Sequence, residues 1–90
     1  MKVHKKVVIR GRVQGVWFRK YAQEQAALFS LSGFVRNEVD GSVYIEVSGE
    51  SEHVQVFIQW CHSGPPLAYV ETVDVEENQE HHTGAFLIKT

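Results

Sequence analysis

The chain has 90 residues, of which 43% are hydrophobic and 22% are charged, and its formal net charge at pH 7 is -2. A chain of this length has room for one hydrophobic core in a folded globular protein, so we expect residues 1–90 to form a single domain. The acidic balance argues against a nucleic-acid partner, because domains that bind phosphate backbones are usually basic over at least one broad face.

The cysteine content and the N-terminal sequence indicate the cellular compartment of the protein. Cys61 is the only cysteine, so the chain can form neither an intrachain disulfide nor a cysteine-based metal site. The apolar run that follows the largely basic residues 2–6 is too short for a signal peptide or a membrane span. We therefore expect a cytoplasmic protein that does not bind membranes.

The first third of the chain has the pattern of a strand, a bend and a helix. Apolar residues at odd-numbered positions from 3 to 13 alternate with polar or basic ones, which predicts a half-buried strand. Apolar residues at helical spacing then predict a helix from about Val16 or Phe18 to about Ser30. Gly33 is expected to take the left-handed conformation just beyond the helix end.

A hairpin is expected next. Residues 33–39 and 42–48 predict two strands, the second with clear alternation of apolar and polar residues. Asp40-Gly41 lies between them and is a strong hairpin signal, because both residues tolerate the positive φ that a tight turn demands.

The second half of the chain predicts one more helix and two more strands. Ser51 is the expected cap of a helix whose apolar residues recur at i, i+3, i+4 and i+7. This helix ends by Ser63, because the Gly-Pro-Pro segment at 64–66 cannot continue it. A strand is predicted over 69–77, and a short strand over 85–88 follows a polar loop.

The resulting order is β-α-β-β-α-β with a short extra C-terminal strand. It predicts an α+β fold of the ferredoxin-like (split β-α-β) plan, in which an antiparallel sheet carries both helices on one face. No internal repeat indicates a solenoid.

The bend between the first strand and the first helix is a candidate anion site. Gly11 and Gly15 allow close backbone approach, and the unpaired amides of the bend and the first helical turn point into one small volume. Arg19 adds a planar donor group that can hold two oxygens at once. A cation is unfavourable at the positive end of a helix dipole, which makes Arg19 a candidate functional residue.

Asn37 is the candidate for the second half of this site. It lies in an otherwise largely apolar and aromatic segment, residues 33–37, where a carboxamide is unfavourable unless it is hydrogen-bonded or used. An amide can both donate to and accept from a water molecule, although it is not a base at neutral pH. We expect Asn37 to hold a water beside the anion.

Two segments of the sequence resemble the signature motifs of the acylphosphatases. They are Ile9-x-Gly11-x-Val13-Gln14-Gly15-Val16-x-Phe18-Arg19 and Gly33-Phe34-Val35-Arg36-Asn37-x-x-Asp40-Gly41-x-Val43. The resemblance covers the whole chain, including the Gly-Pro-Pro turn and the Phe-x-Ile ending. It implies the ferredoxin-like fold and hydrolysis of the carboxyl-phosphate bond of acylphosphates, without a metal or another cofactor.

The resemblance also implies roles for individual residues. Arg19 matches the family's substrate-binding arginine, and Asn37 matches the asparagine that orients the attacking water. The loop that matches the phosphate cradle supplies five backbone amides, those of Gly15, Val16, Trp17, Phe18 and Arg19. We expect a small-molecule acylphosphate as substrate, no nucleic-acid or membrane partner, and a monomer.

Several other noticeable residues are interpreted as structural. Gln14 is assigned to loop architecture, and Cys61 on the apolar stripe of the second helix is assigned to the core. Trp60 lies off that stripe and is expected to be partly exposed. His81 and His82 are expected at a solvated surface rather than in a metal site, because no Asp or Glu spacing completes a set of ligands.

A binding module on the same fold is the alternative function. A ferredoxin-like sheet can stack RNA bases on exposed aromatic residues, or such a domain can bind an anion or a partner protein without turnover. The predicted hairpin offers Tyr44, but Glu46 lies beside it and the overall charge is acidic. These features favour the hydrolase.

Overall fold

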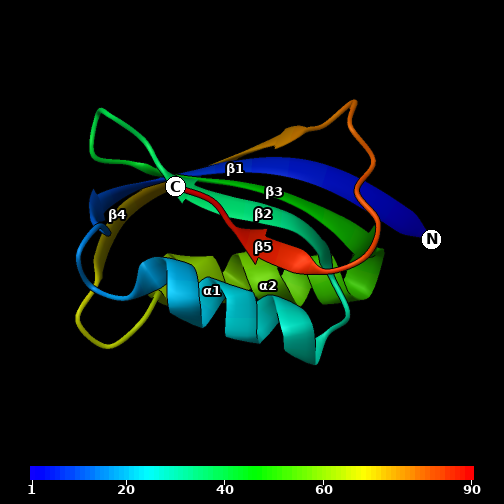
Figure 1. Ribbon diagram of the computed structural model, residues 1–90, viewed down its shortest axis with the longest axis horizontal. Helices are drawn as coiled ribbons and strands as arrows, with labels where there is room; N and C mark the ends of the chain where they lie inside the picture. The colour runs from blue at the N-terminus through cyan, green and yellow to red at the C-terminus, as the bar shows by residue number, and fades with distance from the viewer.

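The computed structural model describes the whole chain from Met1 to Thr90. Its elements in order are β1 (Lys2–Arg12), α1 (Phe18–Leu28), β2 (Ser32–Asn37), β3 (Val43–Glu50), α2 (Ser51–Ser63), β4 (Tyr69–Glu77) and β5 (Phe86–Ile88). Both helices lie on one face of a single sheet, so the molecule has two layers and the other sheet face is open (Figure 1).

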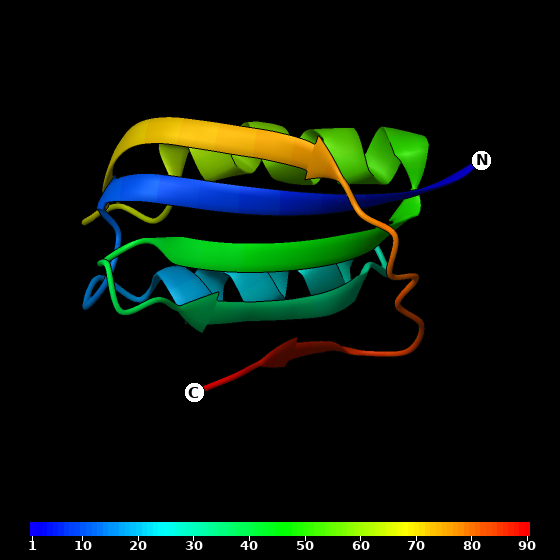
Figure 2. The same cartoon turned by 90° about the horizontal axis from the view of Figure 1, so that it is seen from above.

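The strand order is β4-β1-β3-β2-β5, which confirms the ferredoxin-like α+β fold (Figure 2). The first four strands of this order pair in antiparallel fashion, but β5 pairs parallel with β2. The sheet is therefore mixed, and the expectation of a wholly antiparallel sheet was wrong. The cause is the path of residues 78–85, which cross from β4 at one edge to β5 at the other and so reverse the chain direction relative to β4.

The core lies between the sheet and the helices. Alternation along the central strands places every second side chain against α1 and α2, where burial of apolar area is worth about 25 cal/mol per Å². The residues with no exposed surface in the core are Val7, Ile9, Ala22, Ala26, Val35, Val43, Ile45, Val47, Phe57 and Cys61. Burial of Cys61 confirms its assignment to the core and raises the pKa of its thiol.

The end of α1 differs from the expected one. The helix ends at Leu28, and Ser30 rather than Gly33 takes the left-handed conformation, with φ 54°. Gly33 lies inside β2, where a Cβ atom would be 1.9 Å from the carbonyl oxygen of Glu46. Glycine is required there by the close approach of β3, not by the helix end.

The start of α2 and the hairpin turn also differ in detail. Ser51 is the first residue of α2 rather than its cap, and its amide donates to the carbonyl of Met1 at 2.8 Å. In the turn between β2 and β3, only Gly41 has a positive φ, at 94°. Asp40 instead accepts hydrogen bonds from the backbone and hydroxyl groups of Ser42, at 3.0 and 2.6 Å.

The segment that crosses the sheet is held by histidines on the open face. His81 is exposed, as expected, and it stacks on His4 with ring centroids 3.7 Å apart. His82 is partly buried, contrary to expectation, because its Nε2 lies 2.7 Å from Oε1 of Glu46. No group of three or more His, Cys, Asp or Glu residues is arranged to hold a metal ion.

Glu46 is the centre of this open-face network. Its carboxylate also accepts hydrogen bonds from Tyr44 Oη at 2.6 Å and Asn78 Nδ2 at 3.0 Å. Burial raises the pKa of Glu46, but the hydrogen bonds from Tyr44, His82 and Asn78 outweigh it and lower the pKa to about 2. Burial and the bond to Glu46 raise the pKa of Tyr44 to about 12.

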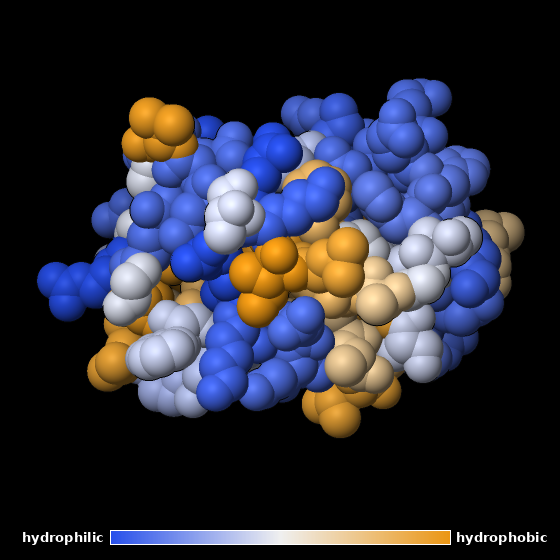
Figure 3. Space-filling model, viewed as in Figure 1, coloured by the Kyte–Doolittle hydropathy of each residue, from blue (hydrophilic) through white to orange (hydrophobic).

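The remaining surface is mostly hydrophilic on the face shown in Figure 3, with apolar side chains gathered over β5. Leu87 and Ile88 are the exposed apolar residues of that strand. Trp60 is partly exposed, as expected, and the centroid of its ring lies 5.3 Å from that of Phe18. Neither helix is long and apolar enough to cross a membrane.

Candidate active site

The loop between β1 and α1 forms a concavity lined with free backbone donors. Gly15 has φ 74°, and Trp17, the residue that caps α1, is also left-handed, with φ 70° and ψ 20°. Left-handed residues next to right-handed ones turn successive N–H groups toward the same point, which favours an anion there. The N–H groups of Gly15, Val16, Trp17, Phe18 and Arg19 donate no hydrogen bond within the protein.

Arg19 lies in the first turn of α1, as expected from the sequence. No acidic residue shares that turn, so the unfavourable interaction with the helix dipole is not offset by a neighbouring carboxylate. The guanidinium donates from Nη1 to the carbonyl oxygen of Lys89 at 3.3 Å, which is a long hydrogen bond. The C-terminal residues thus contact Arg19 while its other donors stay available.

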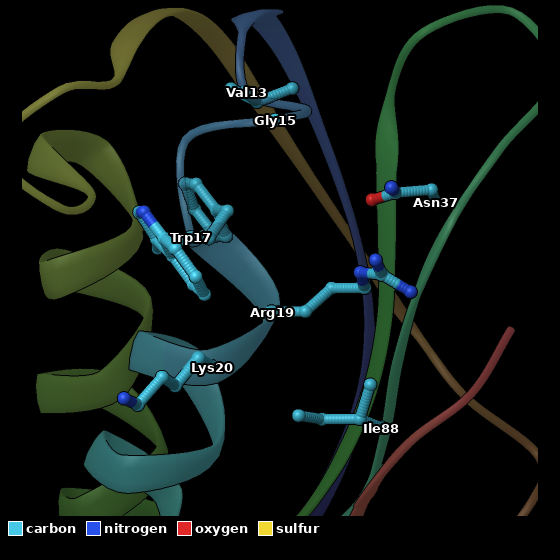
Figure 4. Close-up of a pocket in the computed structure, with 8 residues that line it drawn as sticks. Val13, Gly15, Trp17, Arg19, Lys20, Asn37 and Ile88 are labelled. Carbon is cyan, nitrogen blue, oxygen red and sulfur yellow. The ribbon is translucent and has the colours of Figure 1, made fainter.

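Asn37 is the last residue of β2 and pairs with Val43 across the hairpin. Its position in the strand turns its side chain to the helix-covered face, next to the start of α1. The carboxamide makes no hydrogen bond within the protein, although the residue is partly buried. Figure 4 shows Arg19 extending from α1 toward the strand that carries Asn37.

These groups line one cleft with a volume of about 390 Å³. Its walls are Val13, Gly15, Trp17, Phe18, Arg19, Lys20, Asn37 and Ile88. The structure therefore brings together the two proposed catalytic side chains and three further residues of the loop. The side chain of Val16 lies in the hydrophobic core instead, so only the backbone of that residue is available to the site.

Three residues of the cleft were not expected from the sequence. Val13 ends the alternating pattern of the first strand and is buried, so only its place beside the loop indicates a role. Lys20 follows Arg19 directly, and this second cation was the one feature of the sequence that could have indicated its place in the cleft. Ile88 reaches the cleft because β5 pairs parallel with β2, and no local pattern indicates that pairing.

Gln14 fixes the loop against the hairpin. Its Nε2 donates to the carbonyl oxygens of Glu38 at 2.8 Å and Ser42 at 2.9 Å. This confirms its assignment to loop architecture. The two bonds join the loop that precedes Arg19 to the turn that follows Asn37, so they set the distance between the two halves of the cleft.

Comparison with known proteins agrees with this geometry. Residues 5–88 match the family model described as Acylphosphatase. The chain belongs to the acylphosphatase family. It is 45% identical to an acylphosphatase of Nocardioides sp. over 83 residues, which cover 92% of this chain and 84% of that protein.

Solved acylphosphatase structures have the same fold. An acylphosphatase from Coxiella burnetii superposes with a TM-score of 0.93 at 31% identity, covering 98% of this chain and 93% of that one. An acylphosphatase from Bacillus subtilis gives a TM-score of 0.92 at 33% identity over the full length of both chains.

The charges around the acylphosphatase cleft suit an anionic ligand. Arg19 and Lys20 are the charged residues among its walls, and both are cations. Free amides, a guanidinium and an unpaired carboxamide supply what a phosphoryl group and a water beside it need. The walls carry no hydroxyl, thiol, imidazole or carboxylate side chain that could attack phosphorus.

Proposed function

We propose that this chain hydrolyses acylphosphates at the cleft between α1 and β2, with Arg19 and Asn37 as its catalytic residues. The observation that carries the proposal is the position of Asn37, whose unpaired carboxamide faces the same cleft as Arg19 and the free loop amides. Acylphosphate hydrolase activity follows from membership of the acylphosphatase family.

The loop amides from Gly15 to Arg19 and the Arg19 guanidinium hold the oxygens of the phosphoryl group. Asn37 accepts a hydrogen bond from a water molecule and orients its oxygen toward phosphorus. The new P–O bond forms as the bond from phosphorus to the carboxylate oxygen breaks, and the water proton leaves with the phosphate product. Because a carboxylate is a good leaving group, positioning and charge stabilisation supply most of the rate enhancement.

Benzoyl phosphate hydrolysis in the presence of EDTA tests the activity and its independence of metal. We expect turnover well above the rate in buffer alone. Arg19→Ala should lower kcat/KM by at least about 100-fold, the usual cost of one donor to a developing anion. Arg19→Lys should recover only part of this loss, because an ammonium group cannot hold two oxygens in one plane.

Asn37→Ala separates water positioning from phosphate binding. We expect kcat to fall by about 100-fold while inorganic phosphate inhibits with an unchanged inhibition constant. Arg12→Ala is the matched control, because Arg12 is an exposed arginine near the loop that forms no ion pair and does not line the cleft. Full activity of Arg19→Ala or Asn37→Ala would contradict the assigned roles.

We further infer that residues 1–90 act as one unit, as a monomer in the cytoplasm and without nucleic acid. The open face supports the last point, because the Tyr44 ring lies under the Arg36 guanidinium, 4.8 Å from its centroid, and is not free to stack on a base. Sedimentation, cell fractionation and a titration with single-stranded RNA test these expectations. Salt-sensitive RNA binding would favour the binding module instead.

A further inference from the structure

The acylphosphatase cleft contains a second cation that the proposed phosphate site does not use. Lys20 lines the cleft next to Arg19, is exposed, and forms no ion pair, although Glu24 lies one turn further along α1. None of the residues that line the cleft is acidic. Lys20 therefore adds a positive charge that is not paired with a carboxylate.

Trp17 provides an apolar surface beside this cation. Its side chain is 65% exposed although its backbone is left-handed, and both features oppose the usual preferences of a large aromatic residue. The ammonium group of Lys20 lies 5.8 Å from the centre of the Trp17 ring. Figure 4 shows both side chains on one side of the start of α1, while Arg19 extends from the other side toward Asn37.

The two sides of the cleft would contact two different parts of a ligand. The loop amides and Arg19 face the position proposed for phosphate, which leaves Trp17 and Lys20 to contact whatever is attached to it. An exposed aromatic ring binds a flat or apolar group, and a free lysine binds an anion as a point charge.

We propose that the acyl group of the preferred substrate carries a second anionic group, which Lys20 binds while the part between the two anions lies against Trp17. The inference rests on the proposed function and narrows its substrate class to doubly anionic acylphosphates. Lys20 and Trp17 are then specificity residues rather than catalytic ones.

Two substrates of equal size test the proposal, 4-carboxybenzoyl phosphate and 4-carbamoylbenzoyl phosphate. Their para groups differ in charge but hardly in shape, and neither group can reach the acylphosphate carbonyl. For each, kcat/KM is divided by the rate of uncatalysed hydrolysis. We expect the chain to favour the carboxylate by about two- to fivefold, the effect of an exposed ion pair, and this preference should shrink as salt is added.

Substitutions test whether Lys20 causes the preference for the carboxylate substrate. Lys20→Gln should bring the ratio of the two kcat/KM values close to one, and Lys20→Arg should keep it. Lys6→Gln is the matched control, because it removes the same charge from β1 on the open face of the sheet, away from the cleft. Trp17→Ala should lower the preference for benzoyl phosphate over acetyl phosphate.

Failure of the Lys20 assignment and failure of the proposed function give different results. If the chain hydrolyses both substrates at equal normalised rates, or if Lys20→Gln keeps the wild-type ratio, the assignment of Lys20 is overturned and the proposed function stands. If Lys6→Gln changes the ratio as much as Lys20→Gln, the effect comes from net charge and the site is overturned. If the chain hydrolyses neither substrate nor benzoyl phosphate, the proposed function itself fails.

Discussion

Replacement of Glu46 by glutamine should remove a pH-dependent contribution to stability. The side chain is only 14% exposed, and its carboxylate accepts hydrogen bonds from three partners on the open face. These bonds lower its pKa from 4.5 to about 2 in the folded protein. Such a shift corresponds to about 3 kcal/mol of unfolding free energy, which screening by solvent at the sheet surface reduces to about 1–2 kcal/mol.

The sign of the effect follows from the lowered pKa. Above pH 4.5 the carboxylate is ionised in both folded and unfolded chains, so its full contribution is present. As the pH falls from 4.5 toward 2, the unfolded chain takes up a proton first and the contribution is lost. The difference in unfolding free energy between the wild type and Glu46→Gln should therefore be largest near pH 7 and decrease by about 1–2 kcal/mol at pH 2.5.

Urea unfolding followed by tryptophan fluorescence measures this difference. Glu76→Gln is the control, because Glu76 faces the same side of the sheet from β4 and has no side-chain hydrogen bond or ion pair. A second readout is the ultraviolet titration of Tyr44, whose pKa should fall from about 12 toward its ordinary value of 10 in Glu46→Gln. An equal destabilisation at pH 7 and pH 2.5 would refute the role given to the Glu46 charge.

Other variants test the hydrogen bonds and the packing that hold the fold together. Gln14→Ala should lower the unfolding free energy by about 1–3 kcal/mol in urea titrations and reduce kcat for benzoyl phosphate, because two carbonyls of the hairpin lose their donor. Gly33→Ala should cost at least about 3 kcal/mol, since its Cβ would overlap the backbone of β3, whereas Gly41→Ala, which has free space, should cost about 1 kcal/mol. The fully buried Cys61 should react with a thiol reagent only as fast as the protein unfolds, and fast labelling under native conditions would contradict its burial.

The parts of the fold that follow from local patterns were predictable from the sequence. The alternation of apolar and polar residues located the strands. Apolar residues at helical spacing located both helices, since each pattern reports which face of an element is buried. The path of β5 was not predictable in this way, because three residues carry too little pattern to choose an edge or a direction. The role of Gly33 was misassigned for a similar reason, since the carbonyl that crowds it belongs to Glu46 on another strand.

The candidate site likewise contains some residues that local sequence patterns indicate and others that only the tertiary structure brings together. Arg19 and the loop amides could be proposed because their chemistry lies in one continuous stretch, where glycines and a helix start are visible together. Asn37 could be proposed because a carboxamide within an apolar strand needs an explanation. Ile88 and the contact between Arg19 and the Lys89 carbonyl could not, since both depend on a parallel pairing of distant segments.

The distance between the two halves of the cleft is a tertiary property. The loop before Arg19 and the strand that ends at Asn37 have no backbone pairing with each other, since β1 and β2 are separated by β3 in the sheet. Gln14 bridges this gap with one carboxamide, whose two donors reach two carbonyls of the hairpin turn. An amide is suited to this position because it donates twice without adding a charge that would compete for phosphate. The proposed water and phosphate positions are thus held in register by a residue that contacts neither of them.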